Sequence, residues 1–241
     1  MQLAGKTILL TGGTDGIGRE LALQLKAKGA TPILTGRNPD RIAAMQALGF
    51  EVIAADLSNE AGLETVASAV ERASIDILIN NAGMGTTHDF RHGTPDLDAD
   101  DTCIFLNVNA PIHLITRLMP ALRARPEAMI VNVTSGLAIA PSAGAPVYCA
   151  TKAALRSYTL ALRAQLAGTN IHVVEALPPM VATKMTDGMN GSKMAAPECA
   201  RQIVSAMERN AKEANIGIVK ILQVLNSISP ALVRKIMLSI G

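Results

Sequence analysis

The chain has 241 residues, of which 49% are apolar and 17% are charged, and its formal net charge is only +2. This composition argues against disorder and predicts one α/β domain over residues 1–241. The small charge, with two Tyr, three Phe and no Trp, argues against nucleic acid as a partner.

The cysteines and the apolar runs bear on where the protein works. Cys103, Cys149 and Cys199 are scattered and form no C-x-x-C pair, so we expect neither disulfides nor a zinc site. The first residues do not resemble a signal peptide, and no apolar run reaches the roughly 20 residues of a spanning helix. We therefore expect a cytoplasmic protein without integral membrane insertion.

Short apolar runs typical of buried strands alternate with longer helical patterns along the chain. The predicted strands are residues 7–11, 31–35, 52–55, 75–79, 129–133 and 171–176. The predicted helices are residues 16–28, 39–48, 61–72, 98–123, 146–166 and 197–212. This alternation predicts a doubly wound, Rossmann-like parallel sheet of six or seven strands with helices on both faces.

A glycine-rich turn, T-G-G-T-D-G-I-G at residues 11–18, joins the first strand to the first helix. Glycine permits a tight turn and a close approach of the backbone to a pyrophosphate, which the free N–H groups of the helix can bind. The alternative is a glycine-rich turn that binds nothing. The predicted dinucleotide contacts are Gly12, Thr14, Asp15, Gly16, Ile17 and Gly18.

The spacing T-G-x-x-x-G-x-G resembles the classical short-chain dehydrogenase/reductase superfamily. The resemblance implies a hydride transfer between a nicotinamide and a carbonyl or alcohol carbon. Gly36 and Arg37 follow the second strand, where an acidic residue would favour a ribose hydroxyl and an arginine favours a 2′-phosphate. We therefore predict NADP(H) over NAD(H), with a solvated surface arginine and NAD(H) as the alternative.

The resemblance implies further cofactor contacts after the third, fourth and sixth strands. They are Asp56 and Leu57 near the adenine, Asn81, Ala82 and Gly83 of an N-N-A-G motif, and Pro178, Val181 and Thr183 near the nicotinamide. Pro179 stands where the family has glycine. Because proline fixes φ and removes a donor, we expect a change in the local backbone there.

The candidate catalytic residues are Tyr148 and Lys152, which lie on one helical face because they are four residues apart. A nearby ammonium is expected to lower the pKa of a tyrosine from about 10. Ser135 lies thirteen residues before Tyr148, and Asn107 twenty-eight residues before Ser135. The resemblance implies that Ser135 orients the substrate oxygen, that Lys152 also holds the ribose, and that Asn107 supports a proton relay; Asn109 is a competing candidate.

Structural roles compete with these assignments: Ser135 as a helix cap, Asn107 as a helical hydrogen-bonding residue and Tyr148 as an interface ring. The alternative functions are an NADP(H)-binding sensor or scaffold with little turnover and a membrane-surface reductase of lipid-like substrates. His88 and His92 are four residues apart, but we expect no metal site.

Two later segments carry further expectations. Residues 183–196, with methionines and two glycines nearby, are expected to form a substrate lid over a small apolar substrate. Residues 216–241 form an apolar tail with a predicted strand at 216–219 and helices at 219–225 and 231–240. The tail could cover the pocket, touch a membrane surface or help to form the expected homodimer or homotetramer.

Overall fold

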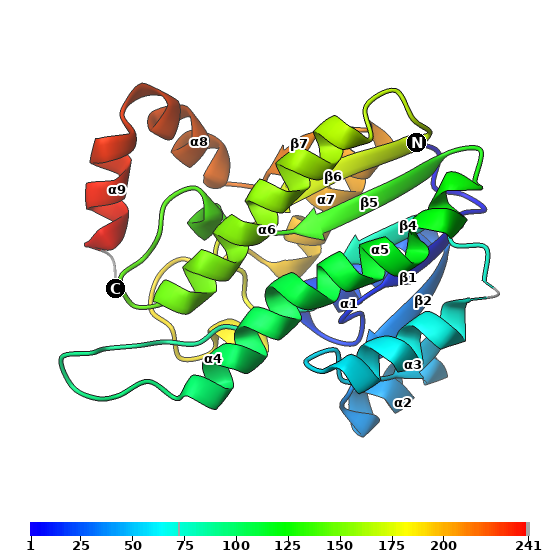
Figure 1. The fold of residues 1–241 in the computed structure, drawn as a ribbon, viewed down its shortest axis with the longest axis horizontal. Helices are drawn as coiled ribbons and strands as arrows, with labels where there is room; N and C mark the ends of the chain where they lie inside the picture. Colours follow the sequence, from blue (N-terminus) through cyan, green and yellow to red (C-terminus); the bar gives the residue numbers. More distant parts are fainter. Residues whose placement is uncertain (72, 240–241) are drawn as a thin grey trace.

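The structure is a computed structural model, and it describes residues 1–71 and 73–239. Seven strands within these residues form one parallel sheet in the order β3-β2-β1-β4-β5-β6-β7 (Figure 1). They are β1 (Thr7–Leu10), β2 (Thr31–Gly36), β3 (Glu51–Ala54), β4 (Ile77–Asn80), β5 (Ala128–Val133), β6 (Ile171–Leu177) and β7 (Glu213–Asn215). The predicted doubly wound α/β fold is confirmed.

Helices cover both faces of the sheet. Neighbouring residues of a strand point to opposite faces, so an apolar strand places apolar side chains on both faces, and each face is buried by helices. Ile8 and Leu10 of β1 pack on one side, with α1 (Gly16–Ala27), α2 (Pro39–Ala47) and α7 (Ala196–Glu208). Leu9 packs on the other side, with α3 (Glu60–Val70), α5 (Ala110–Arg123) and α6 (Pro146–Gln165). Inner strands such as β4 and β5 are thus buried on both faces, which explains their largely apolar sequences, whereas the edge strands β3 and β7 are partly exposed.

The helix predicted over residues 98–123 is interrupted. It consists of α4 (Leu97–Ile104), a π-helical turn at Phe105–Asn109 and α5. Such turns insert a residue into a helix and are frequent at functional sites. Two predicted helix ends, Arg72 and Ile240, lie outside the described residues.

The last strand was predicted at residues 216–219, and this prediction is wrong. The strand is β7, which pairs in parallel with the end of β6. Gly217 then adopts a positive φ of 55°, which turns the chain out of the sheet and into α8 (Val219–Ile228) and α9 (Pro230–Leu238). The predicted apolar helices of the tail are therefore present, but α8 begins immediately after this turn.

A buried ion pair fixes α6 against the sheet. Arg156 of α6 donates to Glu175 of β6 at 2.6 Å and to Glu213 of β7 at 3.3 Å. Glu175 has no exposed surface and also accepts a hydrogen bond from Thr134 at 2.7 Å. Its burial raises the pKa of the carboxyl group, and the Arg156 guanidinium opposes that rise. The Arg156 guanidinium therefore stabilises the ionised form of the buried Glu175 carboxylate.

We predict that Arg156→Ala lowers the free energy of unfolding by about 3–5 kcal/mol, because it leaves Glu175 buried without its cation. Urea denaturation measures this change. Arg201→Ala, which removes a fully exposed pair with Glu198, should leave the stability almost unchanged. Equal effects of the two substitutions would contradict the structural role of Arg156.

Candidate active site

The glycine-rich turn lies at the carboxyl end of β1, where ligands bind in doubly wound sheets. Gly12 and Gly16 have positive φ values of 63° and 51°. A Cβ on Gly18 would lie 2.0 Å from the carbonyl oxygen of Gly12, so only glycine permits this approach. Asp15 caps α1 by accepting from Gly16 at 2.9 Å. The next helical N–H groups, those of Ile17 and Gly18, have no carbonyl of an earlier turn to bond, as in any helix N-terminus.

The N-N-A-G segment is joined to the glycine-rich turn by hydrogen bonds. The Asn81 side chain donates to the carbonyls of Thr11 at 3.0 Å and Gly12 at 3.2 Å. The Thr11 hydroxyl oxygen accepts from the backbone of Asn81 and Ala82, each at 3.0 Å. These bonds hold the ends of β1 and β4 together and place Ala82 directly against Gly12.

The end of β2 lies beside the same turn. A Cβ on Gly36 would lie 2.5 Å from the Thr14 methyl group, so this glycine allows β2 to pack closely on the turn. Arg37 is mostly exposed and pairs with Asp56 at 3.0 Å, which together with a Ser58 backbone bond outweighs burial and lowers the pKa of the Asp56 carboxyl group. The neighbouring Leu57 is buried in the core, with its side chain packed on the α3 and α5 side.

A second arginine at this edge was not predicted from the sequence. Arg41 of α2 pairs with Asp15 of the glycine-rich turn at 2.6 Å. It lies four residues after Arg37, one helical turn into the structure that follows β2. The contact could have been predicted from this position, because a side chain in the first turn of α2 can reach the glycine-rich turn after β1.

Asn107 lies in the π-helical turn and has no exposed surface. Its side chain accepts from the Met84 backbone at 3.0 Å and donates to the Met84 carbonyl at 2.8 Å and to the Thr151 hydroxyl at 3.0 Å. These contacts join the segment after β4 to α6. A Cβ on Gly83 would lie 3.0 Å from Asn107 Oδ1 and 3.3 Å from Lys152 Nζ, so both polar groups lie beside this glycine. Asn109, the competing candidate, is only partly buried.

Ser135 and Tyr148 are brought together from β5 and α6. Ser135 accepts from the Leu137 backbone at 3.1 Å, so its expected role as a helix cap is also present. Burial raises the pKa of Tyr148 to about 12, and a hydrogen bond with the Ser135 side chain acts in the opposite direction. The phenol therefore remains protonated at neutral pH in this structure.

Lys152 lies one turn after Tyr148 on α6 and is only 4% exposed. Its ammonium donates to the Val133 carbonyl at 3.0 Å and lies 5.7 Å from the centre of the Tyr148 ring. Burial lowers the pKa of Lys152 to about 8. The expected lowering of the tyrosine pKa by this lysine is not seen here, because desolvation dominates at both groups.

The segment after β6 lies beside both the glycine-rich turn and the residue that follows Ser135. The Pro178 carbonyl accepts from Gly136 at 2.9 Å, which joins it to the residue after Ser135. Val181 is buried and forms a parallel bridge with Met194, so the segment stays ordered despite Pro179. A Cβ on Gly16 would lie 3.0 Å from the Thr183 methyl group, so Thr183 faces the glycine-rich turn.

His88 and His92 lie in different surroundings. His88 Nε2 lies 2.8 Å from Asp100 of α4 in a buried pair, whereas His92 is largely exposed. Within residues 1–71 and 73–239, no group of three or more His, Cys, Asp and Glu side chains could hold a metal ion. The described helices also include none long and apolar enough to cross a bilayer.

The fold and the turn define a dinucleotide-binding oxidoreductase, and comparison with known proteins agrees. A family model described as short chain dehydrogenase matches residues 6–193. The chain therefore belongs to the short-chain dehydrogenase/reductase family. It is an oxidoreductase that acts on alcohol or carbonyl groups with a nicotinamide dinucleotide, NAD(P)(H).

Three similar proteins show how closely this chain resembles known oxidoreductases. The uncharacterized oxidoreductase DltE of Bacillus subtilis is 44% identical over 187 residues, which cover 76% of this chain and 74% of that protein. The NADP-dependent 3-hydroxy acid dehydrogenase YdfG of Salmonella typhi is 32% identical over 179 residues, 72% of each chain. A short chain dehydrogenase from Burkholderia cenocepacia in complex with NADP has a TM-score of 0.87 and 25% identity and covers 99% of each chain.

The residues present fit such a cofactor. The positive φ of Gly12 and the close packing of Gly18 leave the backbone open to a pyrophosphate at the start of α1. Farther along the edge of the sheet, Gly83 leaves the space in front of Asn107 and Lys152 free of a side chain. A nicotinamide cofactor supplies or accepts the hydride when it is bound.

Proposed function

We propose that the protein is an NADP(H)-dependent reductase of a small, apolar carbonyl compound, or a dehydrogenase of the corresponding alcohol. The observation that carries this proposal is the convergence of Ser135, Tyr148 and Lys152 at one end of the dinucleotide cleft, with Asn107 behind them. Dinucleotide binding alone does not require such an arrangement. It therefore favours turnover over a role as a sensor or scaffold.

Tyr148 acts as the proton donor in the reductive direction. Its high pKa keeps the phenol protonated, and Ser135 hydrogen-bonds both to the phenol and, in the reaction, to the substrate oxygen. As the carbonyl oxygen gains charge, the phenolic proton moves to it, and the buried Lys152 ammonium stabilises the phenolate that remains. In the oxidative direction the same groups remove the proton from the alcohol.

The Asn107 side chain has a positioning role in this proposal. Its amide is already bonded to Met84 and Thr151, so it fixes the π-helical turn against the helix that carries Lys152. Asn107 Oδ1 and Lys152 Nζ lie beside the same residue, Gly83. A water held there would connect the ammonium to solvent, in agreement with the relay that the sequence resemblance implies.

The preference for NADP(H) rests on two arginines. Arg37 uses one guanidinium nitrogen for Asp56, which leaves its other donors for a 2′-phosphate. Arg41 contributes a second cation beside the glycine-rich turn. NADP is the ligand of the Burkholderia cenocepacia structure, and the Salmonella typhi relative is named as NADP-dependent.

The apolar character of the substrate is inferred from the proposed lid, residues 183–196, and from Met180, which lies three residues before it. Met180, Met185 and Met189 are each exposed by 37–46% in this region. Flexible thioether side chains adapt to apolar ligands of varied shape. Gly188 and Gly191, both with positive φ, allow turns that other residues would disfavour.

The main test is Tyr148→Phe. We expect kcat for carbonyl reduction to fall roughly a thousandfold, because the proton donor is lost, while the Kd for NADPH stays within about twofold. Tyr158→Phe is the matched control, since Tyr158 is the other tyrosine, lies on the same helix and is partly buried against the core. Retention of function in cells by a Tyr148→Phe protein that has lost turnover would favour the sensor.

A second prediction concerns pH. Lys152 is charged below its pKa of about 8 and neutral above it, whereas Tyr148 keeps its proton up to a pH of about 12. We therefore expect kcat/KM for carbonyl reduction to fall as the pH rises through about 8. In Lys152→Arg this decline should move to higher pH, because arginine keeps its charge. A profile that is flat between pH 7 and 9 would contradict the role of the ammonium.

A third prediction concerns Arg37→Ala. We expect the Kd for NADPH to rise roughly ten- to hundredfold, which corresponds to the loss of charged hydrogen bonds, and the Kd for NADH to change little. Fluorescence titration with both dinucleotides measures this difference. Arg117→Ala, which removes an exposed arginine that pairs with Glu64, is the control. Equal losses for both dinucleotides would argue against recognition of a 2′-phosphate.

A further inference from the structure

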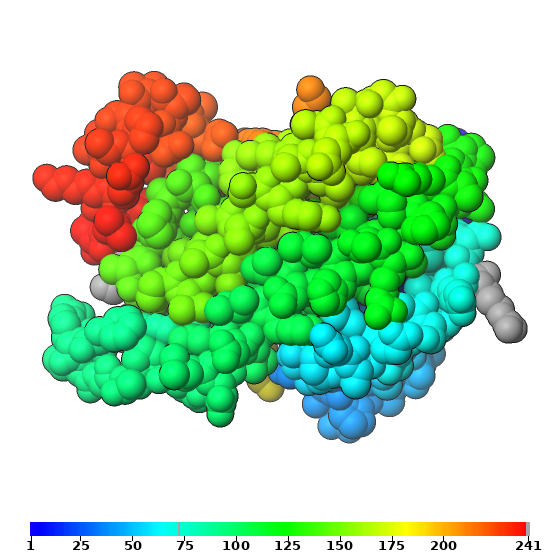
Figure 2. Space-filling view, viewed as in Figure 1, coloured from blue at the N-terminus to red at the C-terminus, as the bar shows by residue number. Residues whose placement is uncertain are grey.

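The end of the chain carries an unusual number of exposed apolar side chains. Sixteen large apolar side chains are exposed in residues 1–71 and 73–239, and eight of them lie between residues 218 and 238. They are Ile218, Ile221, Val224, Leu225, Ile228, Leu232, Ile236 and Leu238. Figure 2 shows this segment standing out from one corner of the molecule. We call α8 and α9 together the hairpin.

Helix α8 is apolar on two opposite sides. Val219 is buried, and a Cβ on Gly136 would lie 2.9 Å from its methyl group, so this side packs on the body of the protein. The other side carries Ile218, Ile221, Leu225 and Ile228, at spacings of three, four and three residues that form one stripe. Their side chains are 47–75% exposed. A surface helix normally places polar residues on such a side.

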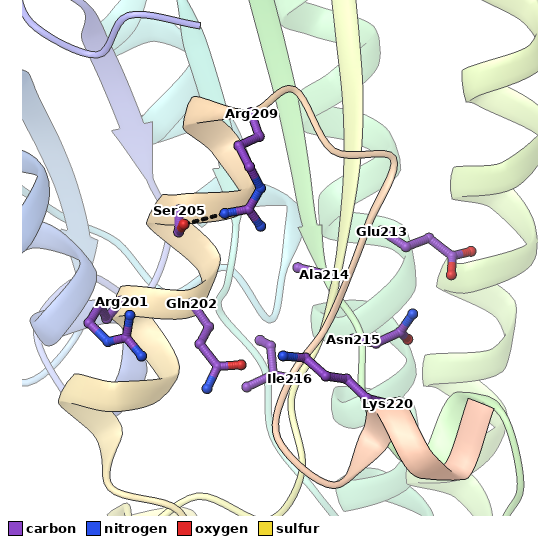
Figure 3. Close-up of a pocket in the computed structure, with 9 residues that line it drawn as sticks. All are labelled: Arg201, Gln202, Ser205, Arg209, Glu213, Ala214, Asn215, Ile216 and Lys220. Atoms are coloured by element: carbon purple, nitrogen blue, oxygen red, sulfur yellow. Dashed lines mark hydrogen bonds between the residues drawn. The ribbon is translucent and has the colours of Figure 1, made fainter. Parts of the chain in front are cut away.

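The charged side chains of the hairpin itself all have one sign. Arg234 and Lys235 of α9 are exposed, and no Asp or Glu occurs between residues 216 and 239. At the start of α8, Arg201, Arg209 and Lys220 line a cavity of about 470 Å³ (Figure 3). Glu213, the carboxylate among its lining residues, is paired with Arg156.

We propose that the hairpin docks on the surface of an anionic lipid bilayer and lies in the headgroup region. An apolar stripe flanked by basic residues, without acidic ones, has the chemistry of helices that bind this interface. Negatively charged lipids complement the cations of the hairpin, which include the exposed Arg234 and Lys235. A second copy of the chain fits less well, because two symmetry-related hairpins would bring cations together without carboxylates to pair them.

Docking of the hairpin brings the catalytic edge of the sheet to the membrane. The hairpin stands at the end of the molecule to which the carboxyl ends of the strands point (Figure 1). Val219 contacts Gly136, which follows Ser135, and Gly217 packs on Met194 of the proposed lid. A membrane bound to the outer stripe of α8 therefore lies one helix away from the candidate site.

Co-sedimentation with vesicles tests this proposal. We expect the full chain to sediment with vesicles of phosphatidylcholine and phosphatidylglycerol, and much less with phosphatidylcholine alone. The double variant Ile221→Gln/Ile228→Gln should bind about a hundredfold more weakly, because two exposed anchors lose their transfer to the lipid. Leu48→Gln, a change of an exposed leucine at the end of α2, is the matched control and should bind like the unchanged protein.

The cations form the second arm of the test. Arg234→Gln/Lys235→Gln should weaken binding to the anionic vesicles roughly 30-fold, since each basic residue near such a surface contributes about a factor of five. Added salt should weaken the binding of the unchanged protein in the same direction. A protein that stays in the supernatant with both kinds of vesicle would overturn the proposal.

Two further measurements keep the outcomes distinct. Light scattering shows whether the chain is an oligomer; if Ile221→Gln/Ile228→Gln dissociates it, the stripe binds a second copy and the proposal is wrong. The same variant should retain turnover of a water-soluble carbonyl compound with NADPH, because neither residue belongs to the candidate site. Loss of vesicle binding with intact turnover thus separates this proposal from the proposed function.

Discussion

The candidate site depends on how α6 is held against the carboxyl ends of β5 and β6. Tyr148, Lys152 and Arg156 follow one another at intervals of four residues, so they lie along one face of this helix. Arg156 binds the buried Glu175, and Lys152 binds the carbonyl at the end of β5. A shift of the helix along the sheet would break both contacts at once. The phenol is therefore fixed by electrostatic contacts one and two turns beyond it.

The same burial that fixes these groups sets their protonation. Desolvation of the half-buried Tyr148 and of the almost inaccessible Lys152 raises the pKa of the phenol and lowers the pKa of the ammonium, and here it exceeds the attraction between opposite charges. The balance suits the proposed role of the phenol as a proton donor in carbonyl reduction. In that proposal the phenol holds its proton until the substrate oxygen becomes negative, and stabilisation by Lys152 matters most when the phenolate forms, which favours the transition state over the ground state.

Local patterns predicted much of this arrangement. The glycine-rich turn and the pair Tyr148 and Lys152 depend on short spacings within one turn or one helix, and the alternation of strands and helices depends on periodicity. Contacts between distant segments were not predictable in this way. The pairing of Arg41 with Asp15, the partners of Asn107 and the end of the sheet at β7 all depend on which segments the fold brings together. The direction in which the pKa of Tyr148 shifts was predicted wrongly for the same reason, since the burial of a side chain depends on all the segments that pack around it.

Gly136 shows how the tail and the site constrain each other. It follows Ser135, donates to the Pro178 carbonyl at 2.9 Å, and lies under Val219 of α8. A larger residue would press on α8 and, through the same backbone, on the serine that meets the phenol. The segment after β7 is thus packed against the residue that follows Ser135. Because Val219 lies directly against this backbone, a change in the position of α8 alters the packing next to Ser135, and whatever binds the outer side of α8 lies one helix away from the candidate site.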